Sequence, residues 1–295
     1  MSAALIGIDW GTSRVRALLL ASDGAVLERR ESDEGLLRVP PSGFPGVCAQ
    51  LTRGWPTRPR LLAGMVGSAH GWCDAGYLDC PADAVALAGA LVPVDAATWI
   101  VPGLRATSPA GQPDVMRGEE TQLVGLDRRD GAVCLPGTHA KWASLAAGRV
   151  TGFATAMTGE VHALCREHSL LGRFMQGEPL PARAEAAFAR GVAHGKRPGG
   201  LLHHLFAARS LTLTGALAPA EVAAWLSGLL IGHEVRALAP AGQITLVGAP
   251  ALTERYAAAL DQLGRKADCV DGVQAAAAGL TRIARAAGLF GERGR

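Results

Sequence analysis

Two short turns that each contain a Gly-Thr pair carry the residue types best suited to holding phosphate. The first is Asp9–Arg14 (DWGTSR) and the second is Pro136–Lys141 (PGTHAK). Glycine lets the backbone approach a ligand closely, and threonine and serine offer hydroxyl and N–H groups to phosphate oxygens. Lys141 could neutralise phosphate charge. The alternatives are an ordinary hairpin for the first turn and a surface lysine for the second.

Asp9 ends an apolar run and is the candidate metal ligand of the first turn. Mg²⁺ keeps much of its water shell in proteins, so one carboxylate acting through water is a sufficient protein ligand. The sequence therefore predicts a Mg²⁺ contact at Asp9.

Arg117–Gln122 (RGEETQ) places two carboxylates at a predicted helix start. A carboxylate beside a phosphate site could take the proton of an attacking hydroxyl, which makes Glu119 and Glu120 the candidate bases, with Glu120 preferred. The alternative is that both only complement the helix dipole.

Gly67–Trp72 (GSAHGW), followed by Tyr77, combines small residues with aromatic side chains after a buried strand. This combination favours a polyol-binding loop. The alternative is a surface loop that contributes one core tryptophan.

Leu246–Pro250 (LVGAP) ends a predicted strand in a turn of small residues before a helix. Such a turn allows a flat adenine ring to pack closely, although a plain strand-to-helix turn would have the same composition.

The elements that position these motifs follow one plan twice. Strands are predicted at Leu5–Ile8, Arg14–Leu20 and Ala25–Arg29, and again at Ala132–Leu135, Lys141–Leu145 and Arg149–Phe153. Each triplet contains a Gly-Thr turn and a second, tighter turn, so a duplicated α/β domain is expected. Helices are predicted at Ala182–Ala193, Pro219–Ala239, Leu252–Leu263 and Val273–Ala287, with another capped by Thr158.

Composition excludes several classes of protein. The 295 residues are 49% hydrophobic and 19% charged, which excludes intrinsic disorder. A net charge of +3 gives no electrostatic case for nucleic acid. The apolar stretch Val222–Gly232 is too short for a bilayer and is expected in the core, with a homodimer face as the alternative. No signal peptide is recognised, and the six cysteines form no CxxC pair, so we expect unpaired, buried thiols in a cytoplasmic protein.

These segments, in this order, resemble the 2-dehydro-3-deoxygalactonokinase family of the sugar kinase, actin and heat-shock ATPase superfamily. DVMRGEETQ, PGTHAKW and TAMTGE are the most specific of them. The resemblance implies a duplicated ribonuclease-H-like (actin-like ATPase) fold with two lobes around a nucleotide cleft. We expect the N-terminal lobe over residues 1–128 and the C-terminal lobe over residues 129–295.

The resemblance also implies a role for each motif. The expected phosphate-binding residues are Gly11, Thr12, Ser13, Arg14, Gly137, Thr138, His139 and Lys141. The expected adenosine-binding residues are Gly248, Ala249 and Pro250, and the expected sugar-acid-binding residues are Ser68, Gly71, Trp72 and Tyr77. Two departures are Pro136, where many relatives begin the motif with Asp, and the lack of a proline before Tyr77.

The implied reaction is transfer of phosphate from ATP, with Mg²⁺, to the 6-hydroxyl of 2-dehydro-3-deoxy-D-galactonate in galactonate catabolism. Arg14, Arg105 and Arg117 are all candidates to meet the substrate carboxylate. The alternatives are an exopolyphosphatase-like phosphohydrolase, a kinase for the epimeric gluconate-derived acid, and a non-catalytic, actin-like nucleotide sensor.

Overall fold

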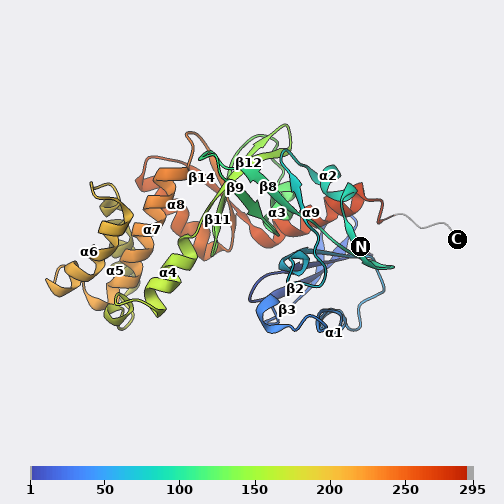
Figure 1. Cartoon of the computed structure of the whole chain (residues 1–295), viewed down its shortest axis with the longest axis horizontal. Coiled ribbons are helices and arrows are strands. Elements are labelled where there is room, and N and C mark those ends of the chain that lie inside the picture. The colour runs from blue at the N-terminus through green and yellow to red at the C-terminus, as the bar shows by residue number, and fades with distance from the viewer. Residues whose placement is uncertain (1, 291–295) are drawn as a thin grey trace. The chain divides into compact units, whose positions relative to one another are not determined.

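One strand order occurs twice in the computed structural model, which describes residues 2–290 (Figure 1). A six-stranded sheet has the order β3-β2-β1-β4-β7-β6, and a five-stranded sheet has the order β12-β11-β10-β13-β14. In both, three consecutive strands lie side by side and the first of them pairs in parallel with a later strand, β4 or β13. A small third sheet has the order β5-β8-β9.

The strands have the following bounds. The six-stranded sheet contains β1 (Ala3–Trp10), β2 (Val15–Ala21), β3 (Val26–Ser32), β4 (Arg60–Gly64), β6 (Val92–Asp95) and β7 (Thr98–Ile100). The five-stranded sheet contains β10 (Gly131–Leu135), β11 (Ala140–Ala146), β12 (Arg149–Ala156), β13 (Ile244–Gly248) and β14 (Ala267–Asp271). The small sheet contains β5 (Tyr77–Asp79), β8 (Gly103–Thr107) and β9 (Pro113–Met116).

The α-helices are interspersed with these strands, and four of them, α4 to α7, follow one another without an intervening strand. Their bounds are α1 (Phe44–Leu51), α2 (Ala84–Gly89), α3 (Glu119–Gly125), α4 (Thr158–Glu167), α5 (Pro181–His194), α6 (Gly200–Leu213), α7 (Val222–Leu238), α8 (Pro250–Gln262) and α9 (Gly272–Ala286). None of the helices within residues 2–290 is both long and apolar enough to cross a bilayer.

The chain divides into two compact units. Among the described residues, the first contains residues 2–131, Ala143–Phe153 and residues 270–290, and the second contains Ala132–Trp142 and Ala154–Cys269. This grouping differs from a single division after residue 128, because α9 and parts of β11 and β12 belong to the first unit.

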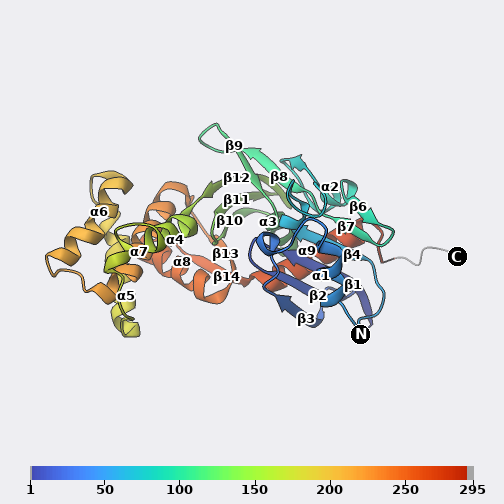
Figure 2. The same cartoon turned by 60° about the horizontal axis from the view of Figure 1, so that its bottom comes forward.

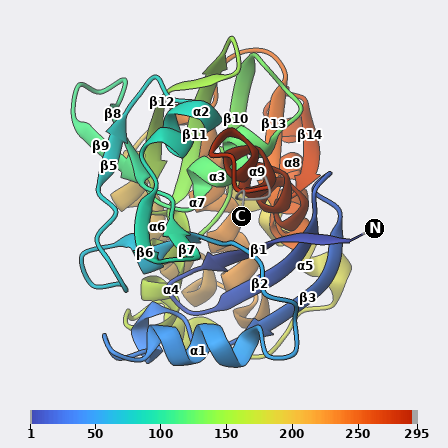
Figure 3. The same ribbon diagram turned by 90° about the vertical axis from the view of Figure 1, so that its right-hand side faces the viewer.

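The six-stranded sheet of the first unit is covered on both faces (Figure 3). Alternate β1 residues, among them Ile8 and Trp10, share a core cluster with Phe44 of α1. On the other face a methyl group added to Gly7 would lie 2.7 Å from Leu280 Cδ1, so α9 packs directly on the strand. Strand alternation therefore explains why β1 is buried on both sides.

The helices α5, α6 and α7 of the second unit pack together, and α7 and α8 also cover the five-stranded sheet (Figures 1 and 2). A methyl group on Gly228 of α7 would lie 2.0 Å from the Phe188 carbonyl oxygen, so only glycine permits this approach. Most of Val222–Gly232 is buried within the chain, which confirms the expected core position.

Three local expectations were wrong. Thr158 is not a helix cap: it is the first residue of α4, and the residue at the cap position, Met157, makes no side-chain cap hydrogen bond. The helices α1, α2 and α6 were not expected, and α6 has almost no apolar periodicity to reveal it. All six cysteines are free, but only Cys48 and Cys134 are buried; Cys269 is exposed, and the other three are half-buried.

Candidate active site

The first Gly-Thr turn joins β1 to β2 and is exposed. The Gly11 N–H donates to the Arg14 carbonyl oxygen (2.8 Å), which closes the turn. A methyl group on Gly35 would lie 2.3 Å from the Ser13 carbonyl carbon, so the following loop packs against the turn backbone. Thr12 and Ser13 consequently lie exposed on a fixed backbone.

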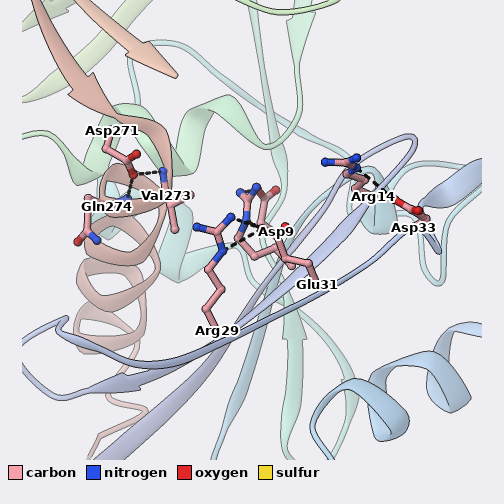
Figure 4. Close-up of polar contacts among 9 residues, drawn as sticks. Asp9, Arg14, Arg29, Glu31, Asp33, Asp271, Val273 and Gln274 are labelled. Atoms are coloured by element: carbon pink, nitrogen blue, oxygen red, sulfur yellow. Dashed lines mark hydrogen bonds and ion pairs between the residues drawn. The ribbon is translucent and has the colours of Figure 1, made fainter. Parts of the chain in front are cut away.

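Asp9 lies at the end of β1, and its carboxylate is not isolated. Its Oδ2 lies 3.3 Å from Nη1 of Arg16, whose Nε donates to Glu31 Oε1 at 2.6 Å (Figure 4). Partial burial raises the pKa of Asp9, and the Arg16 charge opposes that rise. Within residues 2–290 no group of three or more His, Cys, Asp or Glu side chains could hold a metal ion.

The Glu119–Glu120 pair begins α3 at the carboxyl end of two paired strands. Gly64 ends β4 in register with Trp10 of β1, and a methyl group on Gly64 would lie 2.6 Å from the Trp10 carbonyl oxygen. A methyl group on Gly118 would in turn lie 3.2 Å from Gly64 Cα. The structure thus brings the glutamate pair to the sheet edge that carries Asp9, as the motifs predict.

The two glutamates differ sharply in burial. Glu120 is 0% exposed, and its oxygens accept hydrogen bonds from the Gly118 N–H (2.6 Å) and the Thr121 hydroxyl (3.1 Å). Desolvation, with a smaller contribution from the charge of Glu119, raises the pKa of Glu120 to about 8. Glu119 is half-buried, and its Oε2 accepts from the Arg117 N–H at 3.0 Å. Burial therefore favours Glu119 over Glu120 as the group that can reach a ligand.

The second Gly-Thr turn joins β10 to β11 and leaves open space over its glycine. A methyl group on Gly137 would contact nothing within 4 Å. The turn is held from behind by the start of α4, because the Glu160 N–H donates to the Thr138 carbonyl oxygen at 3.0 Å. The Glu160 carboxylate also contacts the His139 ring, so His139 has an acidic partner.

Lys141 is not the surface lysine that was the alternative interpretation. It is 6% exposed, and its Nζ donates to the Thr155 hydroxyl at 3.0 Å. Burying an ammonium group without an anion is costly. The position therefore suits a lysine that receives a negatively charged ligand.

The expected adenosine motif lies beside the second turn. Cys134 of β10 pairs with Leu246 of β13 in parallel register, and a methyl group on Gly248 would lie 3.7 Å from the Pro136 carbonyl oxygen. Ala249 precedes α8, and Pro250 is its first residue, where proline is favoured. Gly137 and Gly248 thus share one sheet edge.

The expected sugar-acid residues do not all have the same environment. Gly71 packs tightly, since a methyl group there would lie 2.1 Å from the Val66 carbonyl oxygen, and Trp72 is partly buried against the core of the first unit. Ser68 has a buried hydroxyl without a hydrogen-bond partner in the described part of the chain. Tyr77 is 40% exposed, and its ring lies under the Arg117 guanidinium, 4.3 Å from centroid to Cζ.

Sequence reasoning missed one buried polar network. Glu234 of α7 is 5% exposed and accepts hydrogen bonds from Trp142 Nε1 (2.7 Å), from the Tyr256 hydroxyl (2.8 Å) and from Thr158. Burial raises the pKa of Glu234, and these three donors oppose the rise. The only available signal was a glutamate within a long apolar helix. The network joins the start of α4, which supports the second turn, to the core.

Known proteins that resemble this chain match it over nearly its whole length. The family model described as 2-keto-3-deoxy-galactonokinase matches residues 9–283. The chain is 40% identical over 296 residues to a protein of Rhizobium meliloti (strain 1021) named a probable 2-dehydro-3-deoxygalactonokinase, with 95% of this chain and 96% of the relative covered. It is 38% identical over 294 residues to the 2-dehydro-3-deoxygalactonokinase of Escherichia coli (strain K12), with 97% and 99% covered.

Solved structures agree. The crystal structure of a protein from Sinorhizobium meliloti, provisionally described as a 2-dehydro-3-deoxygalactonokinase, superimposes on this chain with a TM-score of 0.86. The two are 38% identical, and the match covers 96% of this chain and 98% of that one. The ADPNP-bound activator of 2-hydroxyisocaproyl-CoA dehydratase from Clostridium difficile gives a TM-score of 0.52 at 10% identity, covering 97% and 96%, which is a likeness of fold alone.

These findings confirm the expected fold and the expected family. The duplicated strand order is that of the ribonuclease-H-like, actin-like ATPase fold. The match to the family model and the two full-length relatives lead to one conclusion: the chain belongs to the 2-keto-3-deoxy-galactonokinase family.

Proposed function

We propose that this chain transfers the γ-phosphate of ATP to the 6-hydroxyl of 2-dehydro-3-deoxy-D-galactonate in the cytoplasm. The observation that carries the proposal is the match to two relatives of that name over at least 95% of the chain. The geometry of the motifs supports it, because the two Gly-Thr turns and the start of α3 lie at strand ends, where a ligand can approach the backbone.

Glu119 acts as the base in this proposal. It accepts the proton of the 6-hydroxyl while the hydroxyl oxygen attacks the γ-phosphorus, and the bond from that phosphorus to the bridging oxygen of ADP breaks. Glu120 is too buried to touch the acceptor, and a pKa of about 8 keeps it largely protonated at pH 7. Its role is to fix the start of α3 through the Gly118 N–H.

The nucleotide is bound by backbone and positive charge. Thr12 and Ser13 in the first turn and Gly137 and Thr138 in the second offer N–H and hydroxyl groups to phosphate oxygens. Lys141 supplies the positive charge. Gly248, Ala249 and Pro250 form a surface without long side chains, which suits the adenine ring.

Magnesium fits the first turn. Asp9 is 26% exposed at the end of β1, and Mg²⁺ in kinases takes one or two carboxylates, water and substrate phosphates. When bound with ATP, the ion neutralises phosphate charge. Asp9 would hold it, and the Arg16 charge would oppose the rise that burial causes in the pKa of Asp9.

The test is ATP turnover with Mg²⁺ and purified acceptors. ADP release is expected only with the galactonate-derived acid, strongly reduced release with the gluconate-derived epimer, and no release without an acceptor. Equal release without an acceptor would overturn the kinase in favour of a phosphohydrolase.

A matched pair of variants tests the base. Glu119→Gln should lower kcat by about 100- to 10,000-fold, the usual contribution of a general base, with little change in the KM for ATP. Glu120→Gln should retain activity within about tenfold, because the amide mimics the protonated acid. The reverse order of activities would make Glu120 the base.

A further inference from the structure

Arg117 is a buried cation whose hydrogen-bonding groups are mostly unused. It follows β9, and its side chain is 4% exposed. Nη2 donates to the Gly76 carbonyl oxygen at 3.0 Å, but Nε and Nη1 are shielded from water and have no hydrogen-bond partner within residues 2–290. Nη2 also lies 4.0 Å from a carboxylate oxygen of the exposed Asp74.

This arrangement is unfavourable without a ligand. Guanidinium groups stay protonated in proteins and carry five N–H donors, so an unpartnered one in a dry site keeps its full desolvation cost. Buried charges are normally paired. The unused donors therefore indicate an anionic acceptor that comes from outside the chain.

The surroundings of Arg117 are those of the expected sugar-acid loop. One face of the guanidinium lies over the Tyr77 ring, and a methyl group on Gly67 would lie 3.0 Å from Nη1. The hydroxyl of Ser68, the next residue of that loop, is also buried without a partner. Ser68 and Arg117 thus leave several polar groups unsatisfied around one small loop.

The other two candidate arginines are already paired with carboxylates of the chain. Arg14 pairs with Asp33 at 3.2 Å, and its side chain is 74% exposed (Figure 4). Arg105 makes two hydrogen bonds to the Asp79 carboxylate, at 2.6 and 2.9 Å. Either would have to exchange a close internal carboxylate for the substrate carboxylate, whereas Nε and Nη1 of Arg117 have no hydrogen-bond partner to exchange within residues 2–290.

We infer that Arg117 is the specificity-determining residue that binds the carboxylate of the acceptor. The inference rests on the proposed function, since it names the part of that substrate which the chain recognises. The backbone N–H of Arg117 donates to the Glu119 carboxylate, while the Arg117 side chain packs against Gly67, the residue before Ser68. One segment therefore carries both the proposed base and the group that binds the acid end. Because Nε and Nη1 are covered, the half-exposed Tyr77 ring or the Ser68 loop must shift when the acid binds.

The test compares a charged acceptor with a neutral one. Wild type, Arg117→Met and Arg117→Lys are assayed with 2-dehydro-3-deoxy-D-galactonate and with its carboxamide. Wild type should prefer the acid by at least about 100-fold in kcat/KM, because an unpartnered buried cation rejects the neutral analogue. Arg117→Met should lose about that factor on the acid and little on the amide, with the KM for ATP unchanged.

Arg105→Met is the matched control, because it removes an already paired arginine on the neighbouring strand β8. It should keep the preference for the acid. Thermal unfolding and ATP binding establish that each variant is folded. If Arg117→Met does not fold, Arg117→Lys provides the test: it keeps the charge but loses the planar fork, so a loss of about tenfold is expected on the acid alone.

The outcomes separate this inference from the proposed function. No acceptor-dependent turnover in wild type would overturn the proposed function, and calorimetric titration of wild type and Arg117→Met with the acid would then test Arg117 by binding alone. Turnover in wild type with equal losses on the acid and the amide in Arg117→Met and in Arg117→Lys would overturn the role of Arg117. The same holds if wild type uses both acceptors alike.

Discussion

The buried carboxyl group of Glu120 should make the stability of this protein depend on pH, and Glu120→Gln should remove that dependence. The folded chain raises the pKa of Glu120 from 4.5 to about 8, because the group is fully buried beside Glu119. Between these two pH values the folded chain binds a proton that the unfolded chain has released. The free energy of unfolding therefore falls as the pH rises through this window.

The magnitude follows from the width of the window. Each pH unit well inside this window changes the contribution of this group by about 1.4 kcal/mol, so raising the pH from 5.5 to 7.5 should lower it by about 2–3 kcal/mol. A glutamine has no proton to lose. Its oxygen can accept from the Gly118 N–H, and its amide can donate to the Thr121 hydroxyl, which replaces the hydrogen bonds of the protonated acid.

The assay is urea unfolding at 25 °C at pH 5.5, 6.5 and 7.5, with wild type and Glu120→Gln side by side. From pH 5.5 to pH 7.5 the free energy of unfolding of wild type should fall by about 2–3 kcal/mol more than that of Glu120→Gln. Glu254→Gln, which removes the same charge from an exposed position on α8, should keep the wild-type dependence. Parallel pH profiles for wild type and Glu120→Gln would refute the reasoning.

Three further predictions concern the second unit. Gly137→Ala should keep wild-type thermal stability but raise the KM for ATP about tenfold, because its methyl group projects into open space where we place phosphate. Its control, Gly159→Ala, should instead lower the free energy of unfolding by about 1–3 kcal/mol, since its methyl group would lie 2.5 Å from the Gly137 carbonyl oxygen. Lys141→Met should weaken ATP binding by calorimetry at least about tenfold without lowering thermal stability, and unchanged affinity would exclude Lys141 from the phosphate site. Tyr256→Phe should cost about 1–3 kcal/mol in urea unfolding because the buried Glu234 loses a donor; no loss would mean that water replaces the hydroxyl.

The sequence predicted the duplicated architecture because its signals are local. Alternation in β1 and β2, and the Gly-containing turns between strands, depend on neighbouring residues alone. The same holds for the Glu119–Glu120 helix start and for the turn before α8. The positions of the motifs at strand ends could therefore be predicted without the structure.

The sequence did not predict which groups are buried or paired. Glu119 and Glu120 are adjacent and chemically identical, yet the fold buries Glu120 completely and leaves Glu119 half-buried. Arg14 and Arg117 likewise differ only in the folded chain: Arg14 pairs with Asp33, whereas Nε and Nη1 of Arg117 have no hydrogen-bond partner within residues 2–290. These distinctions arise from tertiary contacts, which leave no mark on local residue patterns.

Helices were missed where their apolar pattern is weak or short. The helix α6 lacks a clear apolar face, and α1 has only eight residues and begins after a Gly-Phe-Pro segment. The Ala-rich α9 was predicted, but not its location, because its packing on β1 depends on the absence of a side chain at Gly7. Long, strongly apolar segments such as α7 were predicted correctly.

The central claim is tested most directly by identifying the product. Purified protein is incubated with ATP, Mg²⁺ and 2-dehydro-3-deoxy-D-galactonate, and the reaction is followed by phosphorus and carbon NMR. The account predicts a phosphate ester on carbon 6 that forms in equal amount to ADP. Inorganic phosphate in place of the ester, or an ester on another carbon, would contradict it.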